Sequence, residues 1–237
     1  PPNSRELYNR ADIFGTVTGS TFDNNYFGSY VFGGYCMTFS GNVYENNLWY
    51  GLDPHDDTDY TTITNNTFRN NAGHGVICSV YCNNLIITDN EAYGNGGNGI
   101  MIHRRVDGAI VEDNISRDNG DSGIAVFDSY DSTIRNNVLT NNRNAAIRFS
   151  VGSSGNLVEG NTMTGISSGT SGNGYIIYAF KGSDLPTQGG NGRLQNNTFR
   201  ANTVTGFKSP VVKFSDATVH VFDGNTITAR SSLTTFE

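Results

Sequence analysis

The sequence predicts an all-β fold: a single-domain, right-handed parallel β-helix, or solenoid, with about 24 residues per coil. Two series of residues with the same period indicate this fold. The first consists of Asn42, Asn66, Asn90, Asn114, Asn137 and Asn161. The second consists of Gly51, Gly75, Gly99, Gly123 and Ala146, each followed by an apolar residue. Solenoid repeats have periods of roughly 20 to 50 residues, and two independent markers in one register make chance an unsatisfactory explanation.

Short strands are expected in every unit, in the order in which the markers occur. The asparagines of the first series lie in the segments 41–47, 65–71, 89–95, 113–119, 136–142 and 160–165. Alternating runs such as 85–88, 109–113 and 132–136 lie between these segments and show a strand period rather than a helical one. We expect the asparagines to stack at one turn of each coil and to hydrogen-bond along the solenoid. The sequon at Asn114 is then internal, and glycosylation there is not expected.

The repeat is less regular toward both ends of the chain. After Asn161 the next anchors are Asn197 and Asn225, so the interval of 36 residues predicts a loop insertion at about 165–192. The inserted residues are expected either in 165–174 or in 182–192, and such a loop is expected to overhang a groove. The first 40 residues repeat less cleanly, and a solenoid that begins abruptly exposes a strand edge. An N-terminal capping element is therefore expected to be missing from this sequence.

Composition restricts the classes of partner. The chain has 237 residues, 29 Gly, 14 Phe, 12 Tyr and only 16% charged residues, which suits one turn-rich β domain over residues 1–237. The net charge of -7 argues against a nucleic-acid partner. No apolar run approaches the ~20 residues of a membrane span, so no membrane partner is expected. We expect a monomer that is secreted, periplasmic or associated with a cell wall. Three cysteines allow at most one disulfide, for which Cys78 and Cys82 are the favoured pair.

Stacking of the coils converts sequence spacing into geometry, because residues one period apart lie about 4.8 Å from each other. If Leu52 points inward, Asp53 and His55 point outward, and the following coils place Ser79 and His103 beside His55. One outward face is then expected to collect Tyr50, Asp53, His55, Asp56, His74, Ser79, His103, Arg104, Arg105, Asp128 and Arg148. The alternative explanation for this cluster is that outward positions of any solenoid are polar and that these residues lie together by chance. In that case His74 only stacks on Tyr50, and His103 only braces Asp128.

Several chemistries can be compared with this set of side chains. Acyl transfer is disfavoured because Ser79 lacks the glycine elbow that accompanies a serine nucleophile. A metal site from His55, Asp53 and His103 is disfavoured because two coils separate the histidines by about 10 Å. Glycoside hydrolysis by two carboxylic acids, Asp53 with Asp56 or Asp128, stays open as an alternative.

Proton abstraction next to a sugar carboxylate uses more of these residues. A histidine supplies a base with a pKa near neutrality, and an arginine offsets the charge of the uronate. Tyr50 is the candidate acid. Reprotonation from the opposite face of the ring gives an epimer, whereas expulsion of the O4 substituent gives cleavage. The residues alone therefore leave an epimerase and a lyase open.

Three segments resemble a known family. The run Y-G-L-D-P-H-D at 50–56 is similar to a signature of mannuronan (alginate) C5-epimerases, a group of β-helix proteins. H-G-V-I-C-S at 74–79 looks like a segment of the bacterial periplasmic and brown-algal branches, and G-I-M-I-H-R at 99–104 looks like the brown-algal branch. The resemblance covers about residues 7–160. It implies conversion of β-D-mannuronate to α-L-guluronate within the polymer, with His55 and Tyr50 as the base and acid pair and Asp53 in the same catalytic cluster.

Two departures from the family pattern affect the assignment. The bacterial periplasmic branch has an arginine directly after the serine, where this chain has Val80, so we assign neutralisation of the carboxylate to Arg104. The calcium-dependent secreted branch has an aspartate in place of Ser79, so no cofactor is expected. The expected partner is an anionic polysaccharide of the alginate or polymannuronate type. A polyuronate lyase and a non-catalytic, glycan-binding β-helix remain the alternatives. The residues expected to contact the substrate are Asp56, His74, Ser79, His103, Arg105, Asp128 and Arg148.

Overall fold

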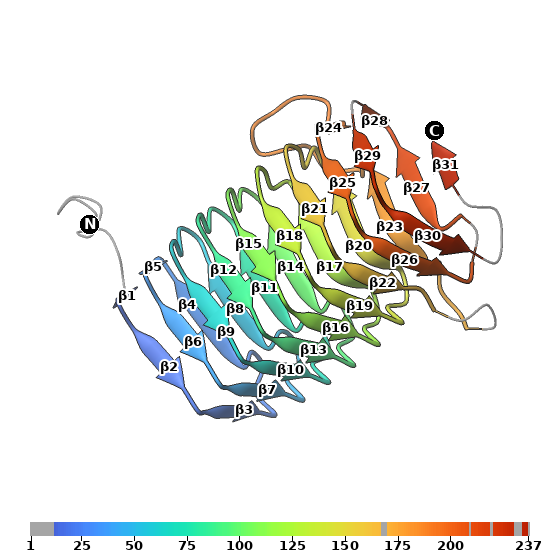
Figure 1. Ribbon diagram of the computed structural model, residues 1–237. Coiled ribbons are helices and arrows are strands. Elements are labelled where there is room, and N and C mark those ends of the chain that lie inside the picture. The colour runs from blue at the N-terminus through green and yellow to red at the C-terminus, as the bar shows by residue number, and fades with distance from the viewer. Residues whose placement is uncertain (1–11, 167–169, 209, 219, 230–233, 237) are drawn as a thin grey trace.

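Three nine-stranded parallel sheets form a right-handed β-solenoid, and each coil adds one strand to each sheet (Figure 1). The computed structural model describes residues 12–166, 170–208, 210–218, 220–229 and 234–236. Within these residues the elements are all strands. The β-helix predicted from the two residue series is therefore confirmed. The expectation that an N-terminal cap is missing concerns what precedes β1 (Asp12–Ile13), and residues 1–11 lie outside the described residues.

The three sheets are called sheets 1, 2 and 3. Sheet 1 consists of β2 (Thr16–Thr18), β6 (Thr38–Ser40), β9 (Thr62–Thr64), β12 (Ile86–Thr88), β15 (Ile110–Glu112), β18 (Thr133–Arg135), β21 (Leu157–Glu159), β25 (Thr198–Arg200) and β29 (Val221–Asp223). Sheet 2 consists of β3 (Thr21–Asp23), β7 (Val43–Glu45), β10 (Thr67–Arg69), β13 (Glu91–Tyr93), β16 (Ile115–Arg117), β19 (Val138–Thr140), β22 (Thr162–Thr164), β26 (Thr203–Gly206) and β30 (Thr226–Ala229).

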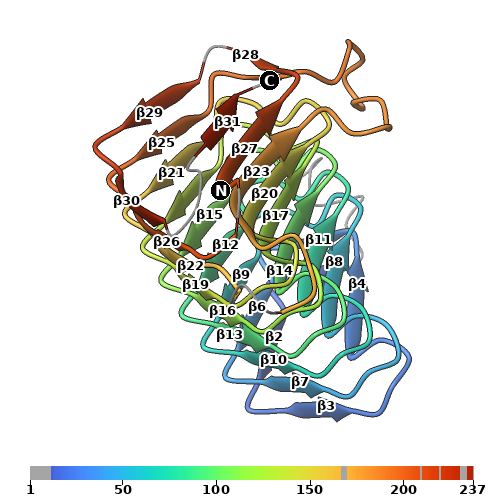
Figure 2. The same ribbon diagram turned by 90° about the vertical axis from the view of Figure 1, so that its right-hand side faces the viewer.

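Sheet 3 has longer strands and lies opposite the corner between the other two sheets, as the view along the solenoid shows (Figure 2). It consists of β4 (Ser29–Phe32), β8 (Leu52–His55), β11 (Val76–Ser79), β14 (Ile100–His103), β17 (Ser122–Phe127), β20 (Ala145–Ser150), β23 (Tyr175–Phe180), β27 (Val212–Ser215) and β31 (Thr234–Phe236). Two further pairs complete the topology: β1 (Asp12–Ile13) with β5 (Gly34–Tyr35), and β24 (Leu194–Gln195) with β28 (Ala217–Thr218).

The core lies between the sheets and follows strand alternation. In the short strands of the central coils of sheets 1 and 2 the middle residue is buried, as in Ile63, Ile87 and Phe68, while the residues on either side, often threonines, face out. Several strands of sheet 3 are preceded by a glycine because consecutive coils pack closely there. A Cβ on Gly75 would lie 2.6 Å from the carbonyl oxygen of Gly99 in the next coil. Only glycine or a locally shifted backbone fits there.

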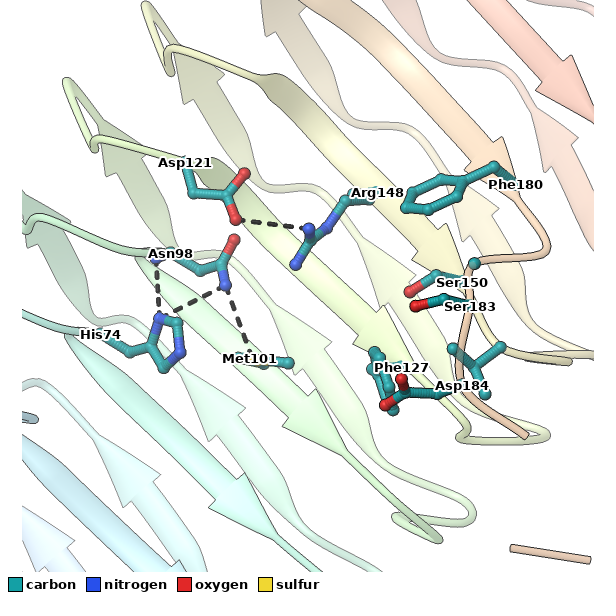
Figure 3. A pocket seen from close by; sticks show the side chains of 12 residues that line it. His74, Asn98, Met101, Asp121, Phe127, Arg148, Ser150, Phe180, Ser183 and Asp184 are labelled. Carbon is teal, nitrogen blue, oxygen red and sulfur yellow. Dashed lines mark hydrogen bonds and ion pairs between the residues drawn. The ribbon is translucent and has the colours of Figure 1, made fainter. Parts of the chain in front are cut away.

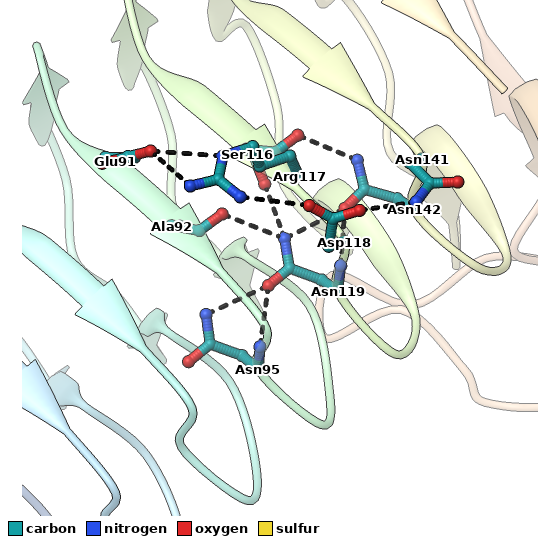
Figure 4. Close-up of polar contacts among 9 residues, drawn as sticks. All are labelled: Glu91, Ala92, Asn95, Ser116, Arg117, Asp118, Asn119, Asn141 and Asn142. Atoms are coloured by element: carbon teal, nitrogen blue, oxygen red, sulfur yellow. Dashed lines mark hydrogen bonds and ion pairs between the residues drawn. The ribbon is translucent and has the colours of Figure 1, made fainter. Parts of the chain in front are cut away.

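The expected asparagine ladder exists. Asn90, for example, donates from Nδ2 to Oδ1 of Asn114 (3.0 Å), and the same oxygen accepts the backbone N–H of Asn90 (3.0 Å). Asn114 is fully buried, as expected for an internal sequon. A second ladder runs parallel to the first and was not anticipated. Figure 4 shows part of it, in which Asn95 donates to Asn119 and Asn119 to Asn142.

One anchor predicted from the sequence is wrong. In the first ladder Asn161 bonds to Asn202, 41 residues later, whereas Asn197 is the partner of Asn156 in a neighbouring column. The reason is that the insertion lengthens two connections of the same coil. Ten residues separate β22 from β23 and 17 separate β23 from β25, against four between β19 and β20 and six between β20 and β21. Both of the segments expected as alternatives therefore hold inserted residues, although 167–169 lie outside the described residues.

The cysteines do not pair. Cys36, Cys78 and Cys82 are free thiols, so the favoured Cys78–Cys82 disulfide is wrong. The Cys78 and Cys82 thiols are fully buried, and the Sγ of Cys82 contacts the carbonyl oxygens of Pro54 and Ser79. They behave as small core residues. Among the described residues there is no helix of the length and apolar character that a membrane crossing needs.

Candidate active site

The outward face of sheet 3 is assembled as the alternation predicts. Leu52 and Pro54 of β8 lie in the interior, whereas Asp53 and His55 project to the other side of the sheet. The register places Ser79 of β11 beside His55, and His103 of β14 beside Ser79. The neighbouring outward column has an apolar floor of Ile77, Met101 and Ala125, which form a buried cluster separate from the main core.

A repeated backbone turn redirects the chain at the end of each of three strands. Two consecutive residues after β8, β11 and β14 have positive φ, as in Arg104 (57°) and Arg105 (62°). This conformation turns the chain away from sheet 3, so the two arginines lie in different surroundings. Arg104 stays at the edge of the sheet above Phe127, with its Cζ 5.2 Å from the ring centroid. Arg105 forms an ion pair with Asp107 (3.2 Å) between the rings of Tyr81 and Tyr130.

A cavity of about 370 Å³ lies over β8, β11 and β14 and brings together six of the predicted residues. They are Tyr50, Asp53, His55, His74, Ser79 and His103. We call this the reaction cavity. Its remaining lining is aromatic and apolar: Phe27, Tyr30, Trp49, Ile77 and Met101.

The Asp53 carboxyl lies at the bottom of the reaction cavity and is 3% exposed. Burial raises its pKa to about 7, an effect that a hydrogen bond from Ser79 opposes and the nearby Asp56 charge reinforces. Its Oδ1 has no hydrogen-bond partner. Asp53 is therefore a carboxyl group that holds or releases a proton near neutral pH.

His55 lies at the opposite end of β8 from Tyr50. Its Nδ1 is 3.0 Å from Oδ2 of Asp56, a distance typical of an ion pair, although the approach lacks hydrogen-bond geometry. The imidazole side chain is 28% exposed and its ring tilts against that of Tyr30, with the centroids 5.4 Å apart. With Asp56 at Nδ1, Nε2 is the atom available to a ligand in the cavity.

Tyr50 and His74 form a stacked pair, with ring centroids 4.8 Å apart and an interplanar angle of 13°. The predicted stacking is therefore confirmed. Nδ1 of His74 accepts the backbone N–H of Asn98 (2.9 Å), which puts the imidazole proton on Nε2. Burial lowers the pKa of His74 to about 4, so the ring is neutral at pH 7. Burial, with the nearby Asp53 charge, raises the pKa of Tyr50 and keeps its phenol protonated.

His103 is a second neutral imidazole. Burial lowers its pKa to about 4, and the Arg104 charge contributes. Its ring packs against Phe127 with the centroids 4.8 Å apart, and its Nδ1 is buried without a partner. The alternative in which His103 braces Asp128 is wrong, because Asp128 has other partners.

Of the predicted substrate contacts, Asp56, Arg105 and Asp128 line neither cavity over sheet 3, although Asp56 lies beside His55. Asp128 is fully buried and accepts hydrogen bonds from Tyr130 Oη (2.8 Å) and from the backbone N–H of Thr187 (2.7 Å). Its role is to hold the loop 181–193. Arg105 is engaged with Asp107 at the outer turn and lines neither cavity over sheet 3. Asp128 (φ 48°) and Arg105 (φ 62°) both follow strands of sheet 3 with positive φ, which redirects the chain beyond the strand ends and which alternation does not predict.

The predicted overhanging loop is present, and Arg104 is attached to it. Nη2 of Arg104 lies 2.9 Å from Oδ2 of Asp184 in the loop 181–193. A second cavity, of about 290 Å³, lies between this loop and sheet 3 (Figure 3). It contains Arg148 and shares His74 and Met101 with the reaction cavity. The two cavities are thus consecutive parts of one groove along the solenoid.

Sequence reasoning missed the residues that the first coil contributes. Tyr30 is paired with Asp53 in the register of β4 and β8, 23 residues earlier, and Phe27 of the same first coil lines the cavity. Trp49, which directly precedes Tyr50 in the next coil, also lines it. The 23-residue spacing could have identified Tyr30, but no first-series asparagine marks this coil. Among the described residues, no group of three or more His, Cys, Asp or Glu side chains is arranged to hold a metal ion.

Comparison with known proteins supports the architecture. Residues 7–163 match the family model described as right handed beta helix region. A comparison with curated protein sequences gives no match.

Solved structures with the same fold include three carbohydrate-active proteins. The periplasmic alginate epimerase AlgG aligns with a TM-score of 0.83 and 21% identity, over 95% of this chain and 53% of that one. The A-module of the Azotobacter vinelandii mannuronan C-5 epimerase AlgE4 aligns with a TM-score of 0.68 and 18% identity, over 86% and 58%. An alginate lyase from Paenibacillus sp. str. FPU-7 gives 0.66 and 15%, over 91% and 80%. The chain therefore spans about half the length of the AlgG structure that it matches.

Proposed function

The chain belongs to the right-handed β-helix family, and within it we propose a polysaccharide C5-epimerase that converts β-D-mannuronate to α-L-guluronate in alginate. The observation that carries this proposal is the groove of sheet 3. There, a phenol, an available imidazole and a carboxyl group with a pKa of about 7 line one cavity. The structural similarity to alginate epimerases and to an alginate lyase supports an anionic uronate polymer as the substrate. AlgG is periplasmic, which supports a secreted or periplasmic location.

The geometry suggests which group is the base and which is the acid. Asp56 at Nδ1 of His55 favours the tautomer whose Nε2 lone pair faces the cavity, so His55 is the proposed base for the C5 proton. The raised pKa of Tyr50 keeps its phenol protonated, so Tyr50 is the proposed acid. The two groups lie at opposite ends of β8. This separation suits removal of a proton from one face of a sugar ring and its return to the other.

Asp53 and Arg104 have supporting roles in this proposal. A neutral Asp53 donates a hydrogen bond to the uronate carboxylate, which gains negative charge as the C5 proton leaves. Arg104 offsets the uronate charge and exchanges its ion pair with Asp184 for the substrate. His74 and His103, both neutral, are proposed as hydrogen-bonding walls, and Ser79 as the partner that orients Asp53.

A polyuronate lyase is the second candidate, favoured by the similarity to the Paenibacillus alginate lyase. The first step is the same, because both reactions remove the C5 proton. The outcome then depends on whether Tyr50 protonates C5 or the departing O4. Only elimination creates an unsaturated sugar that absorbs ultraviolet light.

Proton NMR of polymannuronate incubated with the enzyme in deuterated buffer tests the proposal. We expect guluronate signals, incorporation of deuterium at C5 and no unsaturated ends. His55→Ala and Tyr50→Phe are expected to lower the rate by at least about 100-fold, the usual contribution of general acid-base catalysis. Arg135→Ala, a solvent-exposed arginine of sheet 1, is the matched control for Arg104→Ala. Full activity of Arg104→Ala would exclude the role given to Arg104, and guluronate formation by His55→Ala at the wild-type rate would exclude the mechanism.

A further inference from the structure

The second cavity of the groove contains a basic residue that the proposed reaction does not use. Arg148 lies on β20 in the outward column that includes Ala125 of β17 and Tyr178 of β23. Its side chain is only 18% exposed. Figure 3 shows the guanidinium directed back along the groove toward Asn98 and His74.

Neighbouring side chains hold this guanidinium in place. Nη1 of Arg148 lies 3.3 Å from Oδ2 of Asp121. The other oxygen of Asp121 accepts hydrogen bonds from Nδ2 of Asn144 (2.8 Å) and Oγ of Ser122 (3.1 Å). The ion pair leaves the buried Nε of Arg148 without a partner. The protein therefore leaves part of the hydrogen-bonding capacity of this guanidinium unused, and the side chain lines the second cavity, where a ligand that accepts hydrogen bonds can reach its exposed part.

We propose that Arg148 forms a second carboxylate-binding subsite, which holds a distant uronate of the same polymer chain while another uronate reacts at His55. This inference rests on the proposed function. Guanidinium groups bind carboxylates through paired N–H donors, so Arg148 fits the one group that every residue of a polyuronate carries.

The spacing of the coils sets the distance between the two subsites. Four strand steps lead from β8 to β20, or about 19 Å at the usual strand separation. A 1,4-linked uronate advances by nearly one strand separation per residue. Because the Arg148 side chain reaches back toward His74, the carboxylate that it holds belongs to a sugar roughly two to four residues from the reacting one.

The other groups around the second cavity are consistent with an extended anion. Phe180 forms one wall and stacks on Tyr178, with ring centroids 4.4 Å apart. Lys213 of β27 continues the column beyond Tyr178. Two carboxylates, Asp121 and Asp184, also face the cavity, but each is paired with an arginine. The polymer therefore meets a further cation along this part of the groove.

Oligomannuronates of defined length test the inference, from trimers to decamers. For the wild type we expect kcat/KM to rise with length until the oligomer spans both subsites. Arg148→Gln is expected to lower kcat/KM for decamers about tenfold, the effect of one charge-assisted hydrogen bond, and to lower it far less for trimers. Arg148→Lys is expected to recover part of the loss. Arg135→Gln is the matched control for a lost surface arginine. The double variant Asp121→Asn/Arg148→Gln removes both partners of the ion pair, and thermal unfolding verifies the fold of each variant.

The outcomes separate this inference from the proposed function. Equal losses on trimers and decamers, or none on either, would overturn the distal subsite while leaving the epimerase intact. If the wild type turned over no oligomer, the epimerase proposal would fail. Calorimetric measurement of the binding of the same oligomers would then test the Arg148 subsite independently of any reaction. Tighter binding of long oligomers that is lost in Arg148→Gln supports it, and equal binding by both proteins refutes it.

Discussion

Asp53 illustrates how far single residues could be assigned from sequence. The alternation in L-D-P-H placed Asp53 and His55 on the outward face, and the structure has them there. Alternation does not reveal burial, however, because outward residues of a solenoid are usually exposed to solvent. Here Asp53 lies at the bottom of a cavity walled by Tyr30, Phe27 and Tyr50, so its pKa rises to about 7.

This raised pKa predicts that Asp53 destabilises the fold at high pH. Between about pH 4 and pH 7 the folded protein keeps a proton on Asp53 that the unfolded chain releases, so stability falls as pH rises through this window. Above pH 7 Asp53 is ionised in both states, and the full free-energy cost of burying its charge remains. Asp53→Asn is therefore expected to raise the free energy of unfolding at pH 8 by on the order of 2 kcal/mol, and the Tm by about 5 °C.

The gain should be small near pH 4, where Asp53 is protonated in the folded state and about half protonated in the unfolded chain. Differential scanning calorimetry of wild type and Asp53→Asn at the two pH values measures the difference. An equal gain at pH 4 and pH 8 would mean that the effect is not electrostatic.

At the scale of elements, the asparagine ladders mark the limit of what repeats can predict. The first ladder was predicted from its period. The second was not, although the segments 41–47 and 65–71 each end in a second asparagine five residues after the first. A repeated residue predicts stacking, but only coordinates show which amides are buried. In the structure Asn71, Asn95 and Asn119 are at most 2% exposed.

Substitution in the second ladder is expected to be costly. Oδ1 of Asn95 accepts from Asn71, and its Nδ2 donates to Phe68 O (3.0 Å) and Asn119 Oδ1 (3.0 Å). Asn95→Ala leaves these buried groups unpaired and should lower the free energy of unfolding by about 2–4 kcal/mol. Asn25→Ala, at the exposed end of the same column, should change it by less than about 0.5 kcal/mol. Urea denaturation measures both, and similar losses would argue against the ladder.

The loop 181–193 could be predicted as an insertion, but its anchors could not. They depend on contacts between residues far apart in sequence, namely Asp128 with Thr187 and Arg104 with Asp184. Thr187→Ala removes the hydroxyl donor to Asp128 (2.5 Å). Tryptic cleavage at Lys181 or Arg193 should become roughly tenfold faster, as a charge-assisted hydrogen bond opposes local opening. Ser183→Ala, an exposed position of the same loop, is the control, and unchanged cleavage of Thr187→Ala would contradict this anchoring.

At the scale of the whole molecule, the period alone was enough for the fold. A repeat of 24 residues with strand alternation admits few architectures, and each coil contacts only its neighbours in the three sheets. The sequence could not show how the coils at the ends deviate. There, the spacing between asparagine partners falls to 22 residues, as between Asn25 and Asn47, or rises to 41.

Nearest-neighbour stacking predicts a gradient of protection along the solenoid. Amides of the central coils, such as those of β13, β16 and β19, have a coil on both sides and should exchange most slowly. Exchange should be faster toward β2 and β29. Hydrogen exchange followed by mass spectrometry measures this profile, and uniform protection from end to end would show that the solenoid opens only as a whole.

The uniform coil also makes the protein extensible. Tandem duplication of residues 89–112, one complete 24-residue turn, would leave every inward side chain and both amide columns in phase. It would carry Arg148 one strand separation farther from His55. If Arg148 binds the polymer as proposed, the shortest oligomer that bridges the two positions would then be one sugar longer, and the length preference would change in whole monosaccharide units.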